Sequence, residues 1–506
     1  MLRSVRMSMV AIAVVVVLLT MQSGVEAKKK ISKRSHKTTQ GVPMVLVRPT
    51  FTPDTSDTPV RPIATNDGLV MSSDDVVNNA GSARTASSTP TNRGGIRVDS
   101  VGDSSGSDKK RKGQITIDPN VPLAGSLIIS EFRVSGPSGA NDEYVEIYND
   151  SGANHTVSAV SGTGYAIAAS DGVVRCTIPN ATVIPARGHF LCVNSVAFSL
   201  GTYPAGSGTI GTGDATYATD IPDNAGIALF NNNSGGGSFS LANRFDAVGS
   251  ASEANVLYKE GTGYPTLTLF SINYAFVRDE CGKGAAITVL GLCTISTPKD
   301  TDNNATDFYF VDTNGTFAGA GQRLGAPGPQ GLASPIQRNS TIGTALLDAT
   351  VSKSGSPNRV RDFTSVPAQN STFGTLSLRR RFVNNTGANV TRLRFRVIDL
   401  TTFPAPGGFA DLRPRTSSSV VVAGINDSVT CTAAGQATPC SVTVQGTTLE
   451  TAPAQPNGGG FNSSLSAGTV TLGTPLANGA SIDVQFLLGL QQTGTFKIYV
   501  NIEALP

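Results

Sequence analysis

The chain contains 506 residues with a formal net charge of +3, and 15% of its residues are charged. Globular domains average about 25% charged residues, so this chain offers few solvated helix faces. Its near-neutral charge excludes a whole-molecule attraction to nucleic acid or to anionic membranes. The 3 histidines leave little material for metal-hydrolase or histidine general-base chemistry. At about 150 residues per domain, the length allows two to four domains.

The N-terminus has the pattern of a secretory signal peptide. Arg3 and Arg6 precede the apolar run Met9–Leu19, and Val25-Glu26-Ala27 has the residue sizes of a cleavage site. The run is shorter than the roughly 20 apolar residues that cross a bilayer. We therefore predict that residues 1–27 are removed, that the protein is secreted or belongs to the cell envelope, and that no transmembrane segment remains.

Residues 28–122 are rich in Ser, Thr, Asp, Asn and Pro, and few apolar residues recur at any period. Such a segment cannot bury enough apolar surface to offset the entropy of ordering, so we predict a disordered spacer. Two basic runs, Lys28–Lys37 and Lys109–Lys112, could contact anionic envelope polymers or phospholipid headgroups. The simpler interpretation is a solvated tether.

The six cysteines fall into three pairs of close neighbours along the chain. An even number in an exported protein predicts disulfides, because the compartment is oxidising. Many connectivities are open; we predict the local one, for which the hairpin-like residues between Cys431 and Cys440 are the best support. No spacing is a C-x-x-C pair, which disfavours zinc. The predicted bonds join Cys176 to Cys192, Cys281 to Cys293, and Cys431 to Cys440.

After residue 122 the pattern changes to short β-rich runs bounded by Gly, Asn, Asp and Pro, and no window shows a helical period. In Tyr144–Tyr148, apolar residues alternate with Glu146, which predicts a sheet with one buried face and one wet face. Gly325–Pro329 interrupts the pattern. We therefore predict an all-β protein with two immunoglobulin-like β-sandwich domains, at 123–331 and 332–506.

The opening of the first β region resembles a bacterial lamin-tail domain. The family pattern of I-S-E followed by D/E-aromatic-V/I-E-aliphatic-Y-N is matched by Leu127–Arg133 and Gly139–Asn149. Looser matches are Ile184–Gly188, Arg244–Gly249 and Asp300–Asn304. The resemblance covers about residues 123–331. It implies an immunoglobulin-like sandwich that serves as a binding or structural module, with no catalytic residues to carry over.

The remainder of the chain departs from that family. Gly-rich insertions at Gly201–Gly213 and Asn231–Gly237 make this copy long. The second β region more loosely resembles the fibronectin-like or adhesin-stalk sandwiches of bacterial envelope proteins.

A group of acidic and amide side chains near the end of the first β region has the alternating spacing of a calcium loop, because a hard cation needs several converging oxygens. It fails the EF-hand template, since Ala305 stands where Gly is needed. The alternative is an Asx-rich turn that leads into a strand at Phe308. Calcium is the only cofactor that we consider. The candidate ligands are Asp300, Asp302, Asn304 and Asp307.

Two runs in the second β region, 376–382 and 392–397, place arginines between apolar residues. The turn residues Asn384–Gly387 between them predict a hairpin whose apolar side chains face inward and whose arginines share one exposed face. A polyanion could offset the repulsion between these like charges. The alternative is neutralisation by nearby carboxylates or plain solvation. The five arginines are Arg379, Arg381, Arg392, Arg394 and Arg396.

Four carboxylates near the start of the first β region suggest a glycosidase-like pair, which would need two carboxyl groups at a definite separation. We favour solvated strand charges, or a local ion pair to Arg133. The four are Glu131, Asp142, Glu143 and Glu146.

These features together predict a secreted or cell-envelope protein of the lamin-tail type that is not an enzyme and acts as a structural or adhesive module. Its partner would be a cell-surface or matrix polymer, such as a polysaccharide, or another envelope protein, and not a specific nucleic acid. The alternatives are a polyanion-dependent or calcium-dependent carbohydrate-binding protein and an accessory subunit of an exported hydrolase. Candidate sugar-stacking residues on loops and edges are Tyr203, Tyr217, Tyr258 and Tyr264.

Overall fold

A computed structural model of the 506-residue chain describes residues 127–204, 212–268, 271–279, 298–335 and 341–505, with the backbone of three two-residue strands upstream. All of these residues belong to one unit, 62–506. The predicted signal peptide, the predicted spacer apart from those three strands, and Cys281 with Cys293 lie outside the described residues.

Strands dominate the described residues, so the predicted all-β fold class is confirmed. No helix in this part of the chain is long and apolar enough to cross a membrane. The helical segments are α1 (Asn304–Asp307), α2 (Ser428–Ala433) and the 3-10 turns η2 (Gly236–Ser238), η3 (Leu241–Asn243), η4 (Val256–Tyr258) and η5 (Pro367–Gln369).

The first β region contains two sheets that share one apolar core, in which Phe132 and Phe276 of one sheet meet Ile167 and Leu229 of the other. One sheet has the order β11 (Ala215–Tyr217), β10 (His189–Asn194), β5 (Tyr144–Asn149), β4 (Leu127–Arg133), β14 (Tyr274–Arg278) and β15 (Phe308–Asp312). The other has the order β13 (Arg244–Val248), β12 (Ile227–Phe230), β7 (Gly164–Ala169) and β8 (Val174–Pro179). A separate pair joins β6 (His155–Thr156) to β9 (Val183–Ile184).

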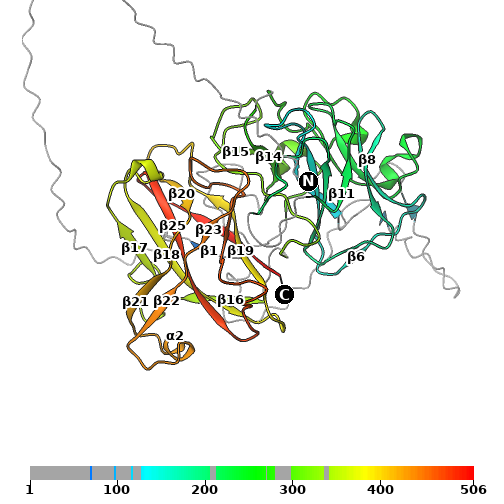
Figure 1. The fold of residues 1–506 in the computed structure, drawn as a ribbon. Coiled ribbons are helices and arrows are strands. Elements are labelled where there is room, and N and C mark those ends of the chain that lie inside the picture. Colours follow the sequence, from blue (N-terminus) through cyan, green and yellow to red (C-terminus); the bar gives the residue numbers. More distant parts are fainter. Residues whose placement is uncertain are drawn as a thin grey trace, which may run out of the picture. The chain divides into compact units, whose positions relative to one another are not determined.

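The second β region also contains two sheets that share a core, and Figure 1 shows β18 and β25 side by side in one of them. That sheet has the order β16 (Ile342–Leu346), β18 (Thr375–Asn384), β25 (Ser481–Gln492) and β20 (Asp411–Arg415), and β17 (Arg359–Asp362) also pairs with β18. The other has the order β1 (Leu69–Val70), β26 (Ile498–Leu505), β19 (Arg392–Leu400), β24 (Ser464–Ser466) and β23 (Thr448–Leu449). Two further pairs are β21 (Val420–Ile425) with β22 (Cys440–Val444), and β2 (Ile96–Arg97) with β3 (Thr116–Ile117).

The predicted hairpin between residues 376–382 and 392–397 is wrong. β18 and β19 follow each other in the chain but lie in different sheets, and they meet through their apolar side chains. The rings of Phe382 and Phe395 are 4.7 Å apart across the core. The predicted alternation of buried side chains is confirmed, because Leu376, Leu378 and Phe382 are at most 4% exposed.

Two of the three predicted disulfides are present among the described residues, and the third lies outside them. Cys176 in β8 is bonded to Cys192 in β10, so this bond joins the two sheets of the first β region. Cys431 in α2 is bonded to Cys440 at the start of β22. The predicted pairing of neighbouring cysteines is therefore confirmed for these two bonds.

The sheet that contains β14 and β15 has apolar side chains on both faces. Phe276 points into the core of the first β region. Ala275, Val277 and Val311 instead join the core of the second region. The two β regions thus share apolar packing along these strands.

Candidate functional site

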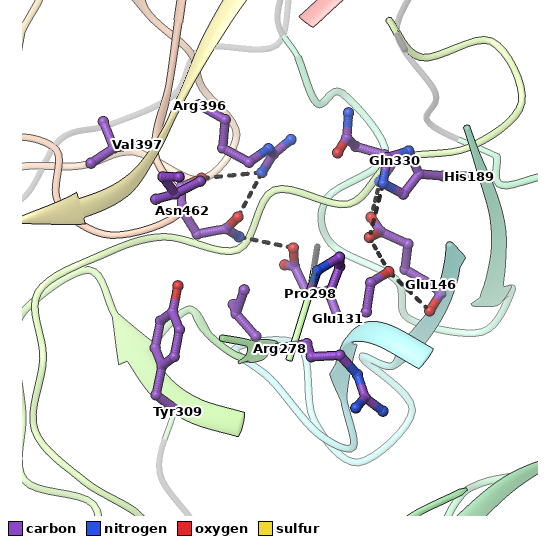
Figure 2. A pocket seen from close by; sticks show the side chains of 13 residues that line it. Glu131, Glu146, His189, Arg278, Pro298, Tyr309, Gln330, Arg396, Val397 and Asn462 are labelled. Atoms are coloured by element: carbon purple, nitrogen blue, oxygen red, sulfur yellow. Dashed lines mark hydrogen bonds and ion pairs between the residues drawn. The ribbon is translucent and has the colours of Figure 1, made fainter. Parts of the chain in front are cut away.

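Glu131 and Glu146 lie opposite each other where β4 pairs with β5 (Figure 2). The β4–β5 register shifts between Ile129 and Glu131, so the strand has a bulge at Ser130. A bulge changes which face the following side chains point to. Glu131 therefore points away from the core of its own region, and so does Glu146, whose two neighbours in β5 belong to that core. Both glutamates lie on the face that the second β region covers.

Each of the two carboxylates accepts hydrogen bonds from fixed donors. Glu131 Oε1 accepts from the Tyr144 hydroxyl over 2.5 Å and from the Gly328 amide over 2.8 Å. Glu146 Oε1 accepts from the Ser130 hydroxyl over 2.5 Å, and its Oε2 accepts from the Gln330 amide over 2.6 Å. The backbone of the segment after β15 thus closes over both groups.

The second β region contributes the opposite charges. Asn462 Nδ2 donates to Glu131 Oε2 over 2.8 Å, while Arg396 Nη1 donates to Asn462 Oδ1 over 2.8 Å. Glu503 lies between two arginines, accepting from Arg394 Nε over 2.5 Å and from Arg396 Nε over 2.7 Å. A continuous chain of polar contacts therefore runs from β4 to β26.

These groups have displaced pKa values because they are enclosed. Burial raises the pKa of Glu131, although the charge of Arg396 opposes this. Burial and the charge of Glu131 raise the pKa of Glu146 well above its usual value. Burial alone would raise the pKa of Glu503, but Arg394 and Arg396 outweigh it and lower that pKa to about 2.

A small cavity lies among these side chains, lined also by His189, Tyr309 and Arg278 (Figure 2). Its volume, counted over the positions that the centre of a water molecule can take, is about 20 Å³. A space of about 10–15 Å³ on that measure holds one water, so a sugar ring does not fit.

The predicted wet face of Tyr144–Tyr148 is wrong. Glu131 and Glu146 are 2% and 3% exposed, and every residue of β5 is buried. The predicted alternation of side chains is present, but the segment around Gln330 and Asn462 cover the outward face.

The other two carboxylates of that predicted group are buried as well. Asp142 forms the expected ion pair with Arg133, through Arg133 Nη2. Glu143 accepts from Asn194 Nδ2 over 2.8 Å and from the Ile221 amide over 2.7 Å. Burial raises the pKa of Glu143 to about 8.

The predicted exposed arginine face is also wrong, because its five arginines lie in two different sheets. Arg381 is 3% exposed and forms two bonds of 2.9 and 3.0 Å with Asp483. Arg394 and Arg396 are 1% and 3% exposed and share Glu503. The remaining two, Arg379 and Arg392, are half-buried.

The candidate sugar-stacking tyrosines are not available for stacking either. Tyr203, Tyr217, Tyr258 and Tyr264 are all buried, at 7% exposure or less. For example, the Arg394 guanidinium lies 5.7 Å from the centre of the Tyr203 ring. The Tyr203 hydroxyl is 2.9 Å from Ser464 Oγ. These rings belong to the packing of the strands.

The predicted calcium residues take different roles around α1. Asn304 is fully buried, and its side chain bonds the backbone at Ala247, Gly249 and Glu260. Asp307 accepts from the amide and the hydroxyl of Thr301 over 2.8 and 2.7 Å. Asp302 is exposed with a left-handed φ of 55°. Asn304 and Asp307 therefore order local backbone, as in the Asx-turn alternative.

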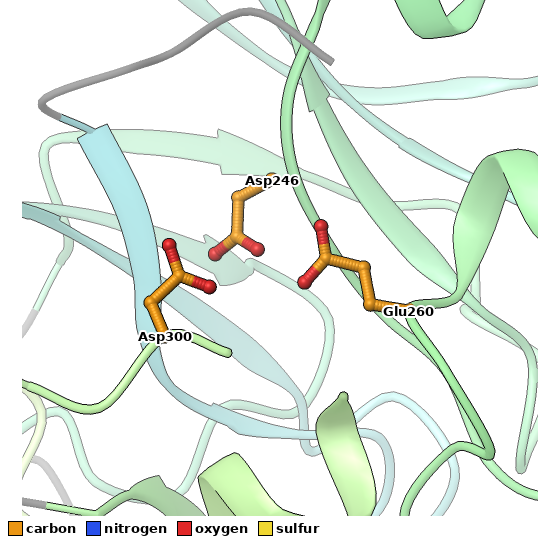
Figure 3. A group of neighbouring side chains, drawn as sticks. All are labelled: Asp246, Glu260 and Asp300. Atoms are coloured by element: carbon orange, nitrogen blue, oxygen red, sulfur yellow. The ribbon is translucent and has the colours of Figure 1, made fainter. Parts of the chain in front are cut away.

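Asp300 instead joins two acidic residues that the sequence analysis did not single out, Asp246 and Glu260 (Figure 3). One carboxylate oxygen of each lies within 4.8 Å of the other two. Arg278 Nη2 donates to Asp246 over 2.6 Å, and Arg244 Nη2 donates to Glu260 over 2.9 Å. Burial and the charge of Asp246 raise the pKa of Glu260 to about 9.

An open hollow of about 480 Å³ lies at one end of the second β region, where β17 meets the turn before β26. Phe363 at its edge is 79% exposed. The Arg361 guanidinium lies 4.6 Å from the centre of the Phe363 ring. Arg359 and Phe496 also line this hollow. An exposed ring beside a guanidinium offers stacking and charge to a ligand at the same place.

Sequence reasoning missed the carboxylates that neutralise the arginines. Asp483 and Glu503 occupy positions between apolar residues in Ser481–Leu488 and Ile498–Leu505. That alternation marks them as partners for arginines on the matching faces of other strands, but it does not say which strands pair.

Comparisons with protein-family models, with curated proteins and with solved structures find no match for this chain.

Proposed function

We propose that this protein is exported and acts as a structural or adhesive module of the cell surface or matrix, and not as an enzyme. In this proposal the first β region is an immunoglobulin-like sandwich of the lamin-tail type, and the second is a fibronectin-like or adhesin-like sandwich. Two sheets around a shared core in each region are compatible with that assignment.

The observation that carries the proposal is that the charged residues of the strands are buried and bonded within the protein. Glu131, Glu146, Arg396 and Glu503 have the chemistry of a reaction centre, yet Arg396 bonds Glu503, and both other carboxylates bond the covering backbone around a cavity of about 20 Å³. Groups used in this way hold the two β regions together.

Export is supported by the two disulfides, because such bonds persist in oxidising compartments. The signal-peptide pattern at residues 1–27 points the same way. Immunoblotting of medium, envelope and cytosol fractions tests this part, and an uncleaved protein found only in cytosol contradicts it.

The proposed contact surface is the hollow beside Phe363, and the proposed partner is an acidic polysaccharide. Phe363 supplies a face for stacking on a sugar ring, while Arg361 supplies a fixed positive charge for a carboxylate or sulfate group. The Arg361 guanidinium is held in place because its Nη1 donates to the carbonyls of Asp362 and Thr375, the latter over 2.8 Å, and its Nη2 donates to the Phe373 carbonyl.

The test is binding of the purified full chain to immobilised heparin and polygalacturonate, with dextran as the neutral control. Phe363→Ala should weaken binding by about tenfold, which corresponds to about 1.4 kcal/mol. Phe317→Ala is the matched control, because Phe317 is 72% exposed and does not line the hollow. Equal binding by both variants, or equal retention on dextran, contradicts the proposed surface.

A further inference from the structure

The acidic group formed by Asp246, Glu260 and Asp300 has a feature that ion pairing leaves unexplained. Glu260 is 5% exposed, and Arg244 bonds only its Oε1. Its Oε2 has no hydrogen-bond donor within reach among the described residues. A buried carboxylate oxygen without a partner is costly, so such a group in a native structure requires an explanation.

The Glu260 carboxylate, to which the unpartnered oxygen belongs, points toward the carboxylates of Asp246 and Asp300 (Figure 3). Asp246 Oδ2 accepts hydrogen bonds from Arg278 and from the Ile129 amide, while Asp246 Oδ1 accepts one hydrogen bond, from the Ala247 amide. A carboxylate oxygen has two lone pairs, so Asp246 Oδ1 can still bind a further group.

We propose that Asp246, Glu260 and Asp300 together bind one Ca²⁺ ion. The distances fit this ion. Calcium takes oxygen ligands at about 2.3–2.6 Å, so oxygens on opposite sides of it lie about 4.6–5.2 Å apart. One oxygen of each carboxylate lies within 4.8 Å of the other two, so the three groups are close enough to reach one calcium ion. Magnesium, at about 2.0–2.1 Å, needs opposed oxygens no more than about 4.2 Å apart, which is a tighter group.

The charge balance also favours a divalent cation. Four carboxylates meet here, since Asp307 lies 3.9 Å from Arg278. Two guanidinium groups, Arg244 and Arg278, face them. With all four carboxylates ionised, the group carries two negative charges more than the two guanidinium groups balance, and one Ca²⁺ would neutralise them.

The site is built before the ion arrives. Asn304 bonds the Glu260 amide over 3.0 Å and the Ala247 carbonyl over 2.8 Å, so it holds the segments that carry Glu260 and Asp246. Asp307 holds Thr301, next to Asp300. The side chain of Asp300 is 23% exposed, which gives the ion a path from solvent. Bound calcium would join β13, the segment after η4 and the segment before α1.

The test is calorimetry and thermal unfolding of the full chain, first treated with EDTA and then titrated with CaCl₂. We expect a saturable rise in Tm that EDTA reverses, and about one ion bound. Glu260→Gln and Asp300→Asn should each weaken calcium binding at least tenfold. If Glu260→Gln does not fold, Asp300→Asn decides, because Asp300 is partly exposed.

Asp302→Asn is the matched control. It removes an exposed carboxylate two residues from Asp300 and leaves the proposed ligands intact, and Asn tolerates the left-handed backbone at this position. It should bind calcium as the unaltered chain does. Three results overturn the proposal: no calcium response in the unaltered chain, an unchanged response in Asp300→Asn, or tighter binding of MgCl₂ than of CaCl₂. None of these bears on polysaccharide binding at Phe363.

Discussion

Arg396 in β19 reaches diagonally across to Glu503 in the paired strand β26, with Arg396 Nε donating to Glu503 Oε1 over 2.7 Å. Both side chains are buried, at 3% and 0% exposure. Arg394 reaches the second oxygen of Glu503, so one carboxylate compensates two guanidinium groups. The contact between the β regions depends on this group, because Arg396 also holds Asn462, which reaches Glu131.

Glu503→Gln should lower the free energy of unfolding by about 3–5 kcal/mol, since it removes the one carboxylate that both buried arginines, Arg394 and Arg396, bond. Urea unfolding followed by circular dichroism measures the change. Asp150→Asn serves as the control, because the Asp150–Arg187 pair is partly exposed and should contribute about 1 kcal/mol or less. A similar small loss in both variants would show that the buried group adds no stability.

Stability should depend on pH through Glu143. Burial raises its pKa from 4.5 to about 8, so the folded protein keeps a proton that the unfolded chain loses. Between these pH values the folded state binds more protons, and raising the pH therefore lowers the free energy of unfolding by up to about 1.4 kcal/mol per pH unit.

Glu143→Gln removes this titration and should flatten the stability profile between about pH 5 and pH 8 relative to the unaltered chain. If the substitution also lowers the free energy of unfolding by an amount that does not depend on pH, the profile shifts without a change in its slope. Urea midpoints at a series of pH values provide the measurement, with Asp302→Asn as an exposed control. Parallel profiles for Glu143→Gln and the unaltered chain would refute the prediction.

The Cys176–Cys192 bond should stabilise the first β region by about 3 kcal/mol, because it closes a loop of about 15 residues in the unfolded chain. Cys176 and Cys192 are 16 residues apart in the sequence, whereas Cys431 and Cys440 are 9 residues apart. Replacing both Cys176 and Cys192 by Ser should lower the urea midpoint of the chain. An unchanged midpoint, with the bond verified by mass spectrometry in the unaltered protein, would rule this out.

Asn304→Ala should destabilise the chain by about 2–4 kcal/mol. The substitution leaves the amides of Gly249 and Glu260 and the carbonyl of Ala247 buried without partners, and each such group costs about 1–3 kcal/mol before relaxation. Asn314→Ala is the control, since Asn314 is exposed and should change stability by about 0.5 kcal/mol or less. Thermal unfolding in EDTA separates this effect from any bound ion, and equal Tm values for the two variants would contradict it.

The sequence was a good guide wherever one strand or one short loop decides the outcome. The burial of Leu376, Leu378 and Phe382 follows from alternation alone, because successive side chains of a strand point to opposite faces. The Cys431–Cys440 bond was accessible because both cysteines belong to one short segment.

The turn signal at Asn384–Gly387 was a poorer guide. It marks a reversal of the chain, but a reversal can lead to the neighbouring strand of the same sheet or across to the opposite sheet. Here β18 takes β25 as its partner, and Arg381 finds Asp483 about a hundred residues away. Both choices bury the same apolar side chains, so alternation does not distinguish between them.

At the candidate site, too, the sequence indicated the residue types but not which of them come together. The sequence predicted carboxylates and arginines on the strands, and the spacing of its acidic residues made Asp300 a candidate ligand for a cation. It did not indicate that Asp246 and Glu260 lie beside Asp300, since they come from separate segments that Asn304 brings together.

By itself, the sequence determined that the chain forms strands, which of their side chains are apolar, and which cysteines lie close enough to pair, because backbone periodicity and short loops are local properties. Only the tertiary structure decided that Glu146 and Arg396 are buried, since a charged side chain can leave water only where distant segments supply its countercharge and its hydrogen-bond donors.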